Sequence, residues 1–412
     1  MEADYKKLFR KLEATLSQIE RQADTPATLA AIVRSLVDDF HEELGVQNAR
    51  LYERRGNSYV LTRTYGPGQH LPAGLRVPVA YPAIQLALER GYCFLSEGDP
   101  EFDEKIEKKL GGVSQFAAIT LGDHGEHLVG FTIRKGADPD QVRLSLNTVR
   151  HAVNLKLRQE VLESLIEEAK RIQTSLLPQG APSFADFDIA GRSVPAEAVG
   201  GDLFDFIAVS GRILGVAIGD SSGHGLPAAL QARDVITGLR VLMNEDYKIV
   251  RAVERINRVI SRGSPVARFI SLFYGELEAN GNLIYTNAGH PPPLVLREGE
   301  IKLLKKGGLV LGPSADAIYD RGYLAFRPGS CMLMYTDGIV EAPSPSGEEF
   351  GTERLAELLR RNAKRPAAEQ VDRIFEAVRK HAPGPLADDQ TVVVVRRPAR
   401  RGDRTQPIPA DH

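Results

Sequence analysis

GRILGVAIGDSSGHGLPAAL, residues 211–230, is the most informative segment in the second half of the chain. Its first part is a short apolar run that ends at Asp220, which is typical of a buried strand. Small residues follow, and Gly225 and Pro227 suit the start of a helix. The stretch therefore predicts a strand that passes into a helix through a turn where the backbone can approach a bound ion closely.

Three further aspartates lie where apolar runs begin or end. Asp202 belongs to VGGDLFD, Asp337 ends SCMLMYTD, and Asp388 stands just before QTVVVV. Carboxylates at the ends of neighbouring core strands would converge on one place and repel one another unless a cation lies among them. Together with Asp220, these residues predict a metal site, and with it an enzyme.

The type of ligand indicates the metal. Carboxylates are hard oxygen ligands, and the sequence has no Cys or His cluster at zinc spacing, so Mg²⁺ or Mn²⁺ is the expected ion. Mg²⁺ takes one or two carboxylates and keeps several waters, so four aspartates suit two ions. Two such ions can activate a water for attack on phosphorus, which predicts phosphoester hydrolysis. The alternative is that Asp-Gly is an ordinary turn dipeptide.

Composition and charge exclude several classes of protein. The chain has 412 residues, which predicts two domains and a linker, and its hydrophobic fraction of 42% is ample for globular folding. The 52 Lys and Arg nearly balance the 54 Asp and Glu, so we expect neither nucleic acid nor a membrane surface as a partner. The first residues are too charged for a signal peptide, and we expect a cytoplasmic protein with Cys93 and Cys331 in its core.

The first 150 residues predict an α+β domain. Residues 1–20 carry an apolar helical stripe, and a second helix should begin after Asp24-Thr25-Pro26 and end near Leu44. A hairpin with Gly56-Asn57 at its turn, a helix, two paired strands and another helix are expected between residues 45 and 150. Residues 21–150 therefore have the size and content of a sensor domain.

A nearly unbroken helical pattern connects this domain to the rest of the chain. An apolar residue recurs every seven positions, at Leu155, Leu162, Ala169 and Leu176. This heptad spacing predicts a coiled-coil linker over residues 151–177, and with it a homodimer. The alternative is a single helix that packs on its own domain. A second domain should cover residues 178–397, and residues 398–412 are polar and Pro-rich, which predicts a disordered tail.

The order of motifs in residues 165–397 resembles that of a known family. The motifs are SLLP (175–178), VGGDLFD (199–205), GDSSGHG (219–225), NAGHPPP (287–293), TDG (336–338) and DDQT (388–391). In this order they resemble the metal-dependent PPM-type serine/threonine phosphatases, in the bacterial SpoIIE/RsbU-like branch. The resemblance implies an α-β-β-α sandwich that hydrolyses phosphoserine or phosphothreonine on a protein with two Mn²⁺ or Mg²⁺ ions.

The resemblance also implies a role for each acidic residue. Asp220 would bridge both ions, the carbonyl of Ser221 would bind one, and Asp337 and Asp388 would hold the other. Asp202 would be a further ligand, directly or through water. Asp220 and Asp337 are thus the expected catalytic carboxylates.

Two acidic residues beside these motifs, Asp205 and Asp389, would orient backbone groups or waters. The sequence departs from the family at Ser221, where a bulkier apolar residue is common, although only the backbone is used there. It also departs at Glu197, where eukaryotic relatives have an arginine. Arg192 is the substitute that we expect to help bind phosphate.

Three residues near the motifs have competing interpretations. His224 is a candidate general acid for the leaving serine oxygen, or it orders its loop. His290 lies before three prolines and is expected to be structural. Phe269 begins an apolar strand and is expected in the core.

The first domain resembles a GAF-type sensor through its order of elements, which implies a pocket for a small-molecule signal, with a protein signal as the alternative. The overall prediction is an α+β protein with a GAF-like α/β domain, a helical linker and a PPM domain. Family resemblance suggests a phosphorylated STAS-domain anti-sigma-factor antagonist as substrate. Two alternatives remain open, namely an inactive phosphatase-like binding module and a phosphoesterase that acts on a small molecule.

Overall fold

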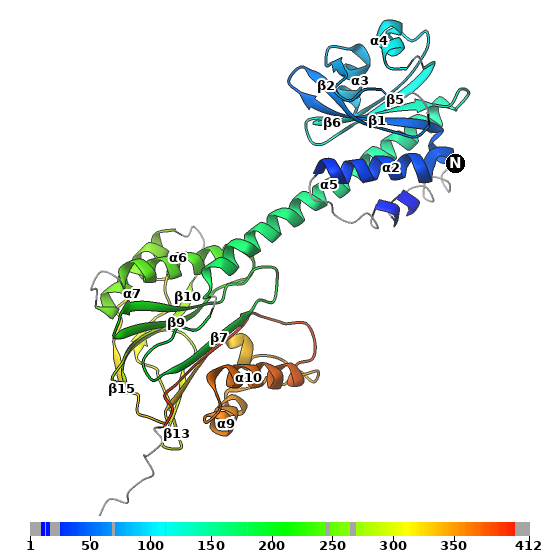
Figure 1. The fold of residues 1–412 in the computed structure, drawn as a ribbon. Helices are drawn as coiled ribbons and strands as arrows, with labels where there is room; N and C mark the ends of the chain where they lie inside the picture. The colour runs from blue at the N-terminus through cyan, green and yellow to red at the C-terminus, as the bar shows by residue number, and fades with distance from the viewer. Residues whose placement is uncertain are drawn as a thin grey trace, which may run out of the picture. The chain divides into compact units, whose positions relative to one another are not determined.

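The chain divides into two compact units, residues 1–165 and residues 166–412, in the computed structural model (Figure 1). The structure describes residues 10–12, 14–16, 25–67, 71–111, 113–178, 180–243, 248–263 and 269–399. Of the helix predicted over residues 1–20, the six described residues are helical. The predicted tail lies outside the described residues except for residues 398 and 399.

The first unit is built on one antiparallel sheet of six strands. The strand order is β3-β2-β1-β6-β5-β4, so β1 pairs with its hairpin partner β2 on one side and with β6 on the other, and β6 in turn pairs with β5. The strands are β1 (Val46–Arg55), β2 (Ser58–Tyr65), β3 (Arg76–Pro78), β4 (Tyr92–Ser96), β5 (Gln115–Leu121) and β6 (His127–Ile133). The predicted hairpin at Gly56-Asn57 is confirmed, since Arg55 pairs with Ser58 across that turn.

Helices cover both faces of this sheet. Apolar side chains of α2 (Thr25–Leu44) and of the first half of α5 (Pro139–Leu176) share one core with the sheet, which also includes Leu12 and Leu16. On the other face, α3 (Pro82–Arg90) packs over a second core that contains Tyr52 and Phe116, and α4 (Glu104–Lys109) follows at its edge. The alternation along each strand thus supplies two apolar surfaces, each closed by helix.

The long helix α5 runs without interruption through the segment predicted to link the domains. The predicted boundary at residue 150 lies inside α5, and the boundary at residue 177 directly follows its end. Leu155, Leu162 and Leu165 are exposed, whereas Val149 and Val153 are buried in the first unit. The helix therefore begins as a core element and continues with apolar side chains that the described residues do not cover.

The second unit contains two sheets. The first has the order β14-β11-β10-β9-β8, with β15 beside β11, and the second has the order β13-β12-β16-β17-β7. The strands of the first are β8 (Leu203–Ser210), β9 (Ile213–Ser221), β10 (Ile270–Glu278), β11 (Asn282–Ala288), β14 (Gly307–Gly308) and β15 (Gly322–Ala325). Those of the second are β7 (Asp188–Val194), β12 (Leu294–Arg297), β13 (Glu300–Leu303), β16 (Cys331–Tyr335) and β17 (Gln390–Arg396).

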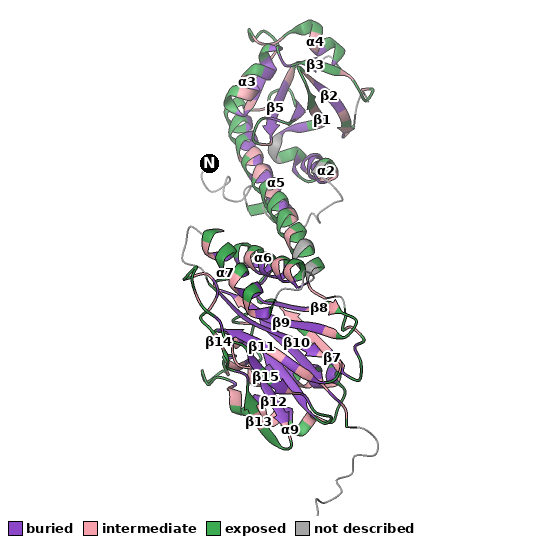
Figure 2. Cartoon of the chain, turned by 90° about the vertical axis from the view of Figure 1, so that its left-hand side faces the viewer, coloured by how far each residue is buried: buried purple, intermediate pink, exposed green. Residues whose placement is uncertain are grey.

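The two sheets pack face to face between helices, which gives four layers. The core between the sheets includes Ile218 and Phe273 from the first sheet and Met334 and Val393 from the second. The helices α6 (Leu226–Leu242) and α7 (Ile249–Gly263) cover the first sheet, and α8 (Asp337–Val340), α9 (Thr352–Asn362) and α10 (Ala367–His381) pack with the second. Figure 2 shows the strands largely buried and the outward helix surfaces exposed. The unit is therefore the α-β-β-α sandwich that was expected.

Individual predictions about the core have mixed outcomes. Cys93 and Cys331 are buried and free, as expected. The prediction for Phe269 is wrong, because its side chain is 44% exposed just before β10 begins.

None of the helices in the described part of the chain is both long and apolar enough to cross a membrane.

Candidate metal centre

The aspartate of the opening stretch lies at the end of a central strand. Asp220 is the penultimate residue of β9 and pairs with Ser271 of β10. The next residue, Ser221, donates its N–H to the carbonyl of Gly201 at 3.2 Å and its hydroxyl to Gln231 Oε1 at 2.8 Å. These two contacts hold the turn before β8 and the start of α6 against the end of β9.

Asp202 joins the two sheets. Its Oδ2 atom accepts a hydrogen bond from Thr336 Oγ1 at 2.8 Å and another from Thr391 Oγ1 at 2.6 Å, and both threonines belong to the second sheet or its edge. Asp202 is buried, and this burial, together with the charge of Asp220, raises its pKa well above the usual range. Its other oxygen takes no part in these threonine contacts.

Asp337 and Asp388 come from neighbouring chain segments at the same edge. Asp337 begins α8 and accepts a hydrogen bond from the N–H of Gly338 at 2.9 Å, and Asp388 accepts one from the N–H of Asp389 at 2.8 Å. A Cβ atom on Gly338 would lie only 2.1 Å from the carbonyl oxygen of Asp389. Glycine at position 338 is therefore what allows these two carboxylate-bearing segments to approach.

Burial and mutual repulsion raise the pKa values of these carboxylates. Burial, followed by the charges of Asp337, Asp388 and Asp389, raises the pKa of Asp220 to about 8. Burial and the charge of Asp388 also raise the pKa of Asp337. A cation beside these groups would relieve the repulsion and return the carboxylates to their ionised forms.

The residues fit a hard divalent cation held partly by water. Among the described residues, no group of three or more His, Cys, Asp or Glu side chains is arranged so that it could hold a metal ion. Mg²⁺ does not require such a group, because it commonly takes one or two carboxylates and keeps its waters. A cavity of about 380 Å³ gives room for such waters, and Asp220, Ser221, Asp388 and Asp389 line it.

Gly201, which directly precedes Asp202, leaves the space beside Ser221 and Asp220 open. A Cβ atom on Gly201 would lie 2.8 Å from the carbonyl oxygen of Ser221 and 3.4 Å from Asp220 Oδ1. Any other residue would therefore fill the space beside the two oxygens that are expected to bind the ions.

The two acidic residues expected to orient the site have different partners. Asp389 accepts hydrogen bonds from the N–H groups of Ala196 at 2.8 Å and Gly201 at 2.6 Å, so it fixes the loop that precedes Asp202. Asp205 instead forms a two-contact ion pair with Arg240 of α6, at 2.7 and 3.2 Å. Asp202 thus faces the second sheet, whereas Asp205 faces the helix layer.

His224 lines the same cavity as Asp220 and is exposed. Its Nδ1 atom lies 2.9 Å from Glu197 Oε1. Glu197 stands where an arginine was expected from eukaryotic relatives, and its contact with His224 is its role in this structure. Arg192 does not take over phosphate binding, because it pairs with Asp372 of α10 and lies over the ring of Phe375, so that prediction is wrong.

His290 is structural, as expected. Ser271 Oγ lies 2.8 Å from its Nδ1, and its Nε2 lies 3.1 Å from the carbonyl oxygen of Tyr335. Because a carbonyl can only accept, Nε2 carries the proton and Nδ1 accepts from the hydroxyl. Burial lowers the pKa of His290 to about 3, so the ring is neutral. The residue links β10 of one sheet to β16 of the other.

Sequence reasoning missed two side chains of the centre, Thr336 and Thr391. Their hydroxyls fix Asp202, and the N–H of Thr391 also donates to Thr336 Oγ1 at 2.9 Å. The available signal was a polar β-branched residue directly beside Asp337 and close after Asp389, at the edge of otherwise apolar runs. A hydroxyl in such a place needs a partner, and a buried carboxylate is a suitable one.

The second unit is similar in sequence to known proteins. Residues 210–398 match the family model described as "Stage II sporulation protein E (SpoIIE)". Protein IcfG of Synechocystis sp. is 29% identical over 317 residues, which cover 68% of this chain and 49% of IcfG. The phosphoserine phosphatase RsbU of Bacillus subtilis is 29% identical over 242 residues, covering 58% of this chain and 72% of RsbU.

A solved structure shares the fold. The SiaA-PP2C domain of Pseudomonas aeruginosa aligns with a TM-score of 0.53 at 19% identity and covers 58% of this chain and 98% of that domain. The chain spans about half the length of IcfG, so the similarity to that relative concerns part of a longer protein.

Proposed function

Because the second unit contains a SpoIIE-family, PP2C-type phosphatase domain, we propose that this protein is a metal-dependent phosphatase of phosphoserine and phosphothreonine in proteins. One observation carries the proposal. Aspartates that are up to 186 residues apart in the chain, from 202 to 388, meet at one edge of the two sheets, where burial and then the charges of neighbouring aspartates raise the pKa of Asp220 to about 8. Such an arrangement is stable in its ionised form only with cations present.

We assign the metal ligands from this arrangement. Asp220 and the carbonyl of Ser221 would hold one Mg²⁺ or Mn²⁺ ion, and Asp220, Asp337 and Asp388 would hold a second. Bound ions of this kind lower the pKa of water and neutralise charge on a phosphoryl group. The protein's contribution is to hold the ligand side chains in place, and the hydrogen bonds of Thr336 and Thr391 to one oxygen of Asp202 do this for that carboxylate.

His224 is the proposed general acid. It lines the cavity beside Asp220, and its Nδ1 contact with Glu197 leaves Nε2 as the atom that can carry a proton toward a leaving serine oxygen. The same contact also orders the loop, which is the other role considered for this histidine. A proton donor is useful here because a serine alkoxide is a poor leaving group.

The substrate is proposed by analogy. RsbU, 29% identical, is named as a phosphoserine phosphatase, which supports phosphoserine in a protein as the substrate class. We extend this to a phosphorylated STAS-domain anti-sigma-factor antagonist in a partner-switching pathway, an assignment that rests on the family alone. An inactive binding module is disfavoured because all four candidate ligand aspartates are present.

Regulation by the first unit is part of the proposal. We keep the assignment of residues 21–150 as a GAF-like sensor, of residues 151–177 as a dimerising coiled coil, of residues 178–397 as the phosphatase domain and of the cytoplasm as location. The exposed Leu155, Leu162 and Leu165 of α5 support a dimer, since a second copy of the helix would cover them. A conformational change in the first unit would then be transmitted through α5, the helix that precedes the phosphatase domain.

The test of the proposed function is turnover of a phosphoserine peptide and of an aryl phosphate against Mn²⁺ concentration. We expect activity that requires Mn²⁺ and falls at least 100-fold in Asp337→Asn. The control is Asp372→Asn, the same substitution at a residue that pairs with Arg192 on α10, and it should keep wild-type activity.

The other outcomes separate the alternatives. Mn²⁺ binding without turnover of either substrate would indicate a binding module. Turnover of nucleotides or other small phosphoesters in preference to the peptide would indicate a small-molecule phosphoesterase. Equal loss in both variants would show that the effect is unfolding and not loss of a ligand.

A further inference from the structure

A groove of about 690 Å³ lies beside the candidate metal centre of the second unit. Two segments line most of it, namely residues 341–345, which follow α8, and residues 382–388, which lie between α10 and β17. Leu386, Ala387 and Asp388 also line the cavity at Asp220. The groove is therefore continuous with the place where a phosphoryl group would bind.

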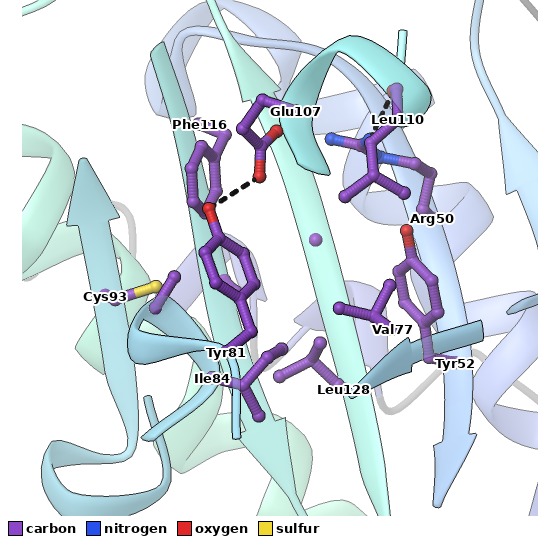
Figure 3. Close-up of a pocket in the computed structure, with 13 residues that line it drawn as sticks. Arg50, Tyr52, Val77, Tyr81, Ile84, Cys93, Glu107, Leu110, Phe116 and Leu128 are labelled. Carbon is purple, nitrogen blue, oxygen red and sulfur yellow. Dashed lines mark hydrogen bonds between the residues drawn. The ribbon is translucent and has the colours of Figure 1, made fainter. Parts of the chain in front are cut away.

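The groove is large enough for a stretch of peptide. For comparison, the cavity inside the first unit that Tyr81 and Glu107 help to line measures about 30 Å³ (Figure 3), which is room for about two waters. The volume of the groove instead falls among those of ligand-binding clefts, roughly 300–1,000 Å³. Because it adjoins the metal centre, the residues next to a phosphoserine bound there would enter it.

Proline stiffens both lining segments. Pro343 and Pro345 belong to the first, Pro383 and Pro385 belong to the second, and all four are exposed. A proline ring fixes its own backbone angle φ, so these segments have little conformational freedom to lose when a ligand binds. Proline also has no N–H group, so these positions offer apolar rings and carbonyl oxygens to a ligand.

Hydrogen bonds tie the two segments to one another at both ends of the second. His381, the last residue of α10, donates from Nε2 to the carbonyl oxygen of Glu348 at 2.9 Å, since a carbonyl can only accept. Gln390, the first residue of β17, donates from Nε2 to the carbonyl oxygen of Gly338 at 3.0 Å. The shape of the groove is therefore fixed by the fold before a ligand binds.

The charge of the groove is negative. Glu341 and Asp388 line it, and among its described lining residues there is no lysine, arginine or histidine. Partial burial, followed by the charges of Asp337, Glu349 and Asp388, raises the pKa of Glu341, so these carboxylates act on one another. Asp337 and Asp388 are proposed metal ligands, which leaves Glu341 as the carboxylate of the groove that can attract a cationic side chain.

We propose that this groove binds the polypeptide segment next to the phosphoserine of the protein substrate, and that Glu341 selects segments with a lysine or arginine there. The hydrocarbon stem of such a side chain would lie along the proline rings, with its charged end at Glu341. An acidic segment would be repelled by the same carboxylate. The inference rests on the proposed phosphatase function, because it requires the phosphoserine to lie at the metal centre.

The test compares two phosphoserine peptides as substrates of the full chain at saturating Mn²⁺. The peptides share one apolar sequence and carry either lysine or glutamate at the second and third positions on both sides of the phosphoserine. We expect kcat/KM to be about tenfold higher for the lysine peptide, because one peptide is attracted and the other repelled.

An aryl phosphate, which has no peptide to place in the groove, reports on the metal centre alone. Hydrolysis of the aryl phosphate with equal kcat/KM for the two peptides would overturn this inference and leave the phosphatase function standing. No turnover of any of the three substrates would overturn both.

Variants test whether Glu341 is responsible for the preference. Each peptide rate is divided by the rate of the same variant with the aryl phosphate, so that changes at the metal centre cancel. Glu341→Gln should reduce the preference for lysine to about threefold, and Glu341→Lys should reverse it. The control is Glu376→Lys, the same change of charge at an exposed residue of α10 that does not line the groove, and it should keep the preference. An unchanged preference in Glu341→Lys, or an equal change in Glu376→Lys, would overturn the proposal.

Discussion

The neutral His290 should make the second unit sensitive to acid. An unfolded histidine takes up a proton near pH 6.5, whereas burial lowers the pKa of His290 in the folded protein to about 3. The folded pKa is the lower one, so the unfolded state binds more protons between these values. The resulting stability is fully present above pH 6.5 and is lost as the pH falls toward 3.

The expected loss follows from these two values. Each pH unit below 6.5 favours the unfolded state by about 1.4 kcal/mol, so His290 alone should remove about 2.5 kcal/mol between pH 7.0 and pH 4.5. Carboxylates titrate in the same range, and a variant is needed to separate them. His290→Asn cannot titrate, and it should be less stable at every pH because it loses the contacts to Ser271 and Tyr335.

The assay is urea unfolding of wild type and His290→Asn at both pH values. The chain has no tryptophan, so Phe206→Trp in both proteins gives a fluorescence signal from the second unit alone. The free energy of unfolding of the wild type should fall by about 2.5 kcal/mol more than that of the variant. Equal losses in the two proteins would refute a buried neutral histidine, and a larger loss in the variant would reverse the sign of the argument.

Three other predictions concern the metal centre. Thr391→Val removes one of the two hydroxyl contacts to Asp202. It should raise the Mn²⁺ concentration for half-maximal activity about tenfold, and the maximal rate should be less affected. An unchanged Mn²⁺ requirement would contradict this prediction. Gly338→Ala places a methyl group against a backbone oxygen and should abolish activity and lower the melting temperature, whereas Gly211→Ala, where a Cβ meets nothing within 4 Å, should change neither. Because the pKa of Asp220 is about 8 without metal, Mn²⁺ affinity measured by calorimetry should increase with pH up to about 8, and a flat profile would show that Asp220 is not a ligand.

Local pattern in the sequence predicts where the candidate ligands lie along the chain. Asp220, Asp337 and Asp388 each stand beside an apolar run, and the structure places Asp220 near the end of β9, Asp337 at the start of α8 and Asp388 just before β17. The long helix was found because its apolar residues recur over more than thirty positions. Such signals lie within a few residues of one another and need no knowledge of the fold.

Other features depend on contacts between distant segments and could not be predicted. The partner of Asp205 is Arg240, on a helix that covers its strand, and no spacing rule connects residues 35 positions apart. Phe269 was placed in the core because it adjoins an apolar strand, but the chain has not yet entered the sheet at that residue. Arg192 was expected at the centre, and its position on β7 instead directs it to α10.

The position of β17 has a consequence for the order of synthesis. This strand lies between β16 and β7 in the second sheet, and the segment just before it supplies Asp388 and Asp389. It is also the last strand described in the chain, so it leaves the ribosome after every other part of the centre. A nascent chain therefore carries β7 without its neighbour for about 200 residues of translation, and the candidate metal centre forms only when the final strand inserts.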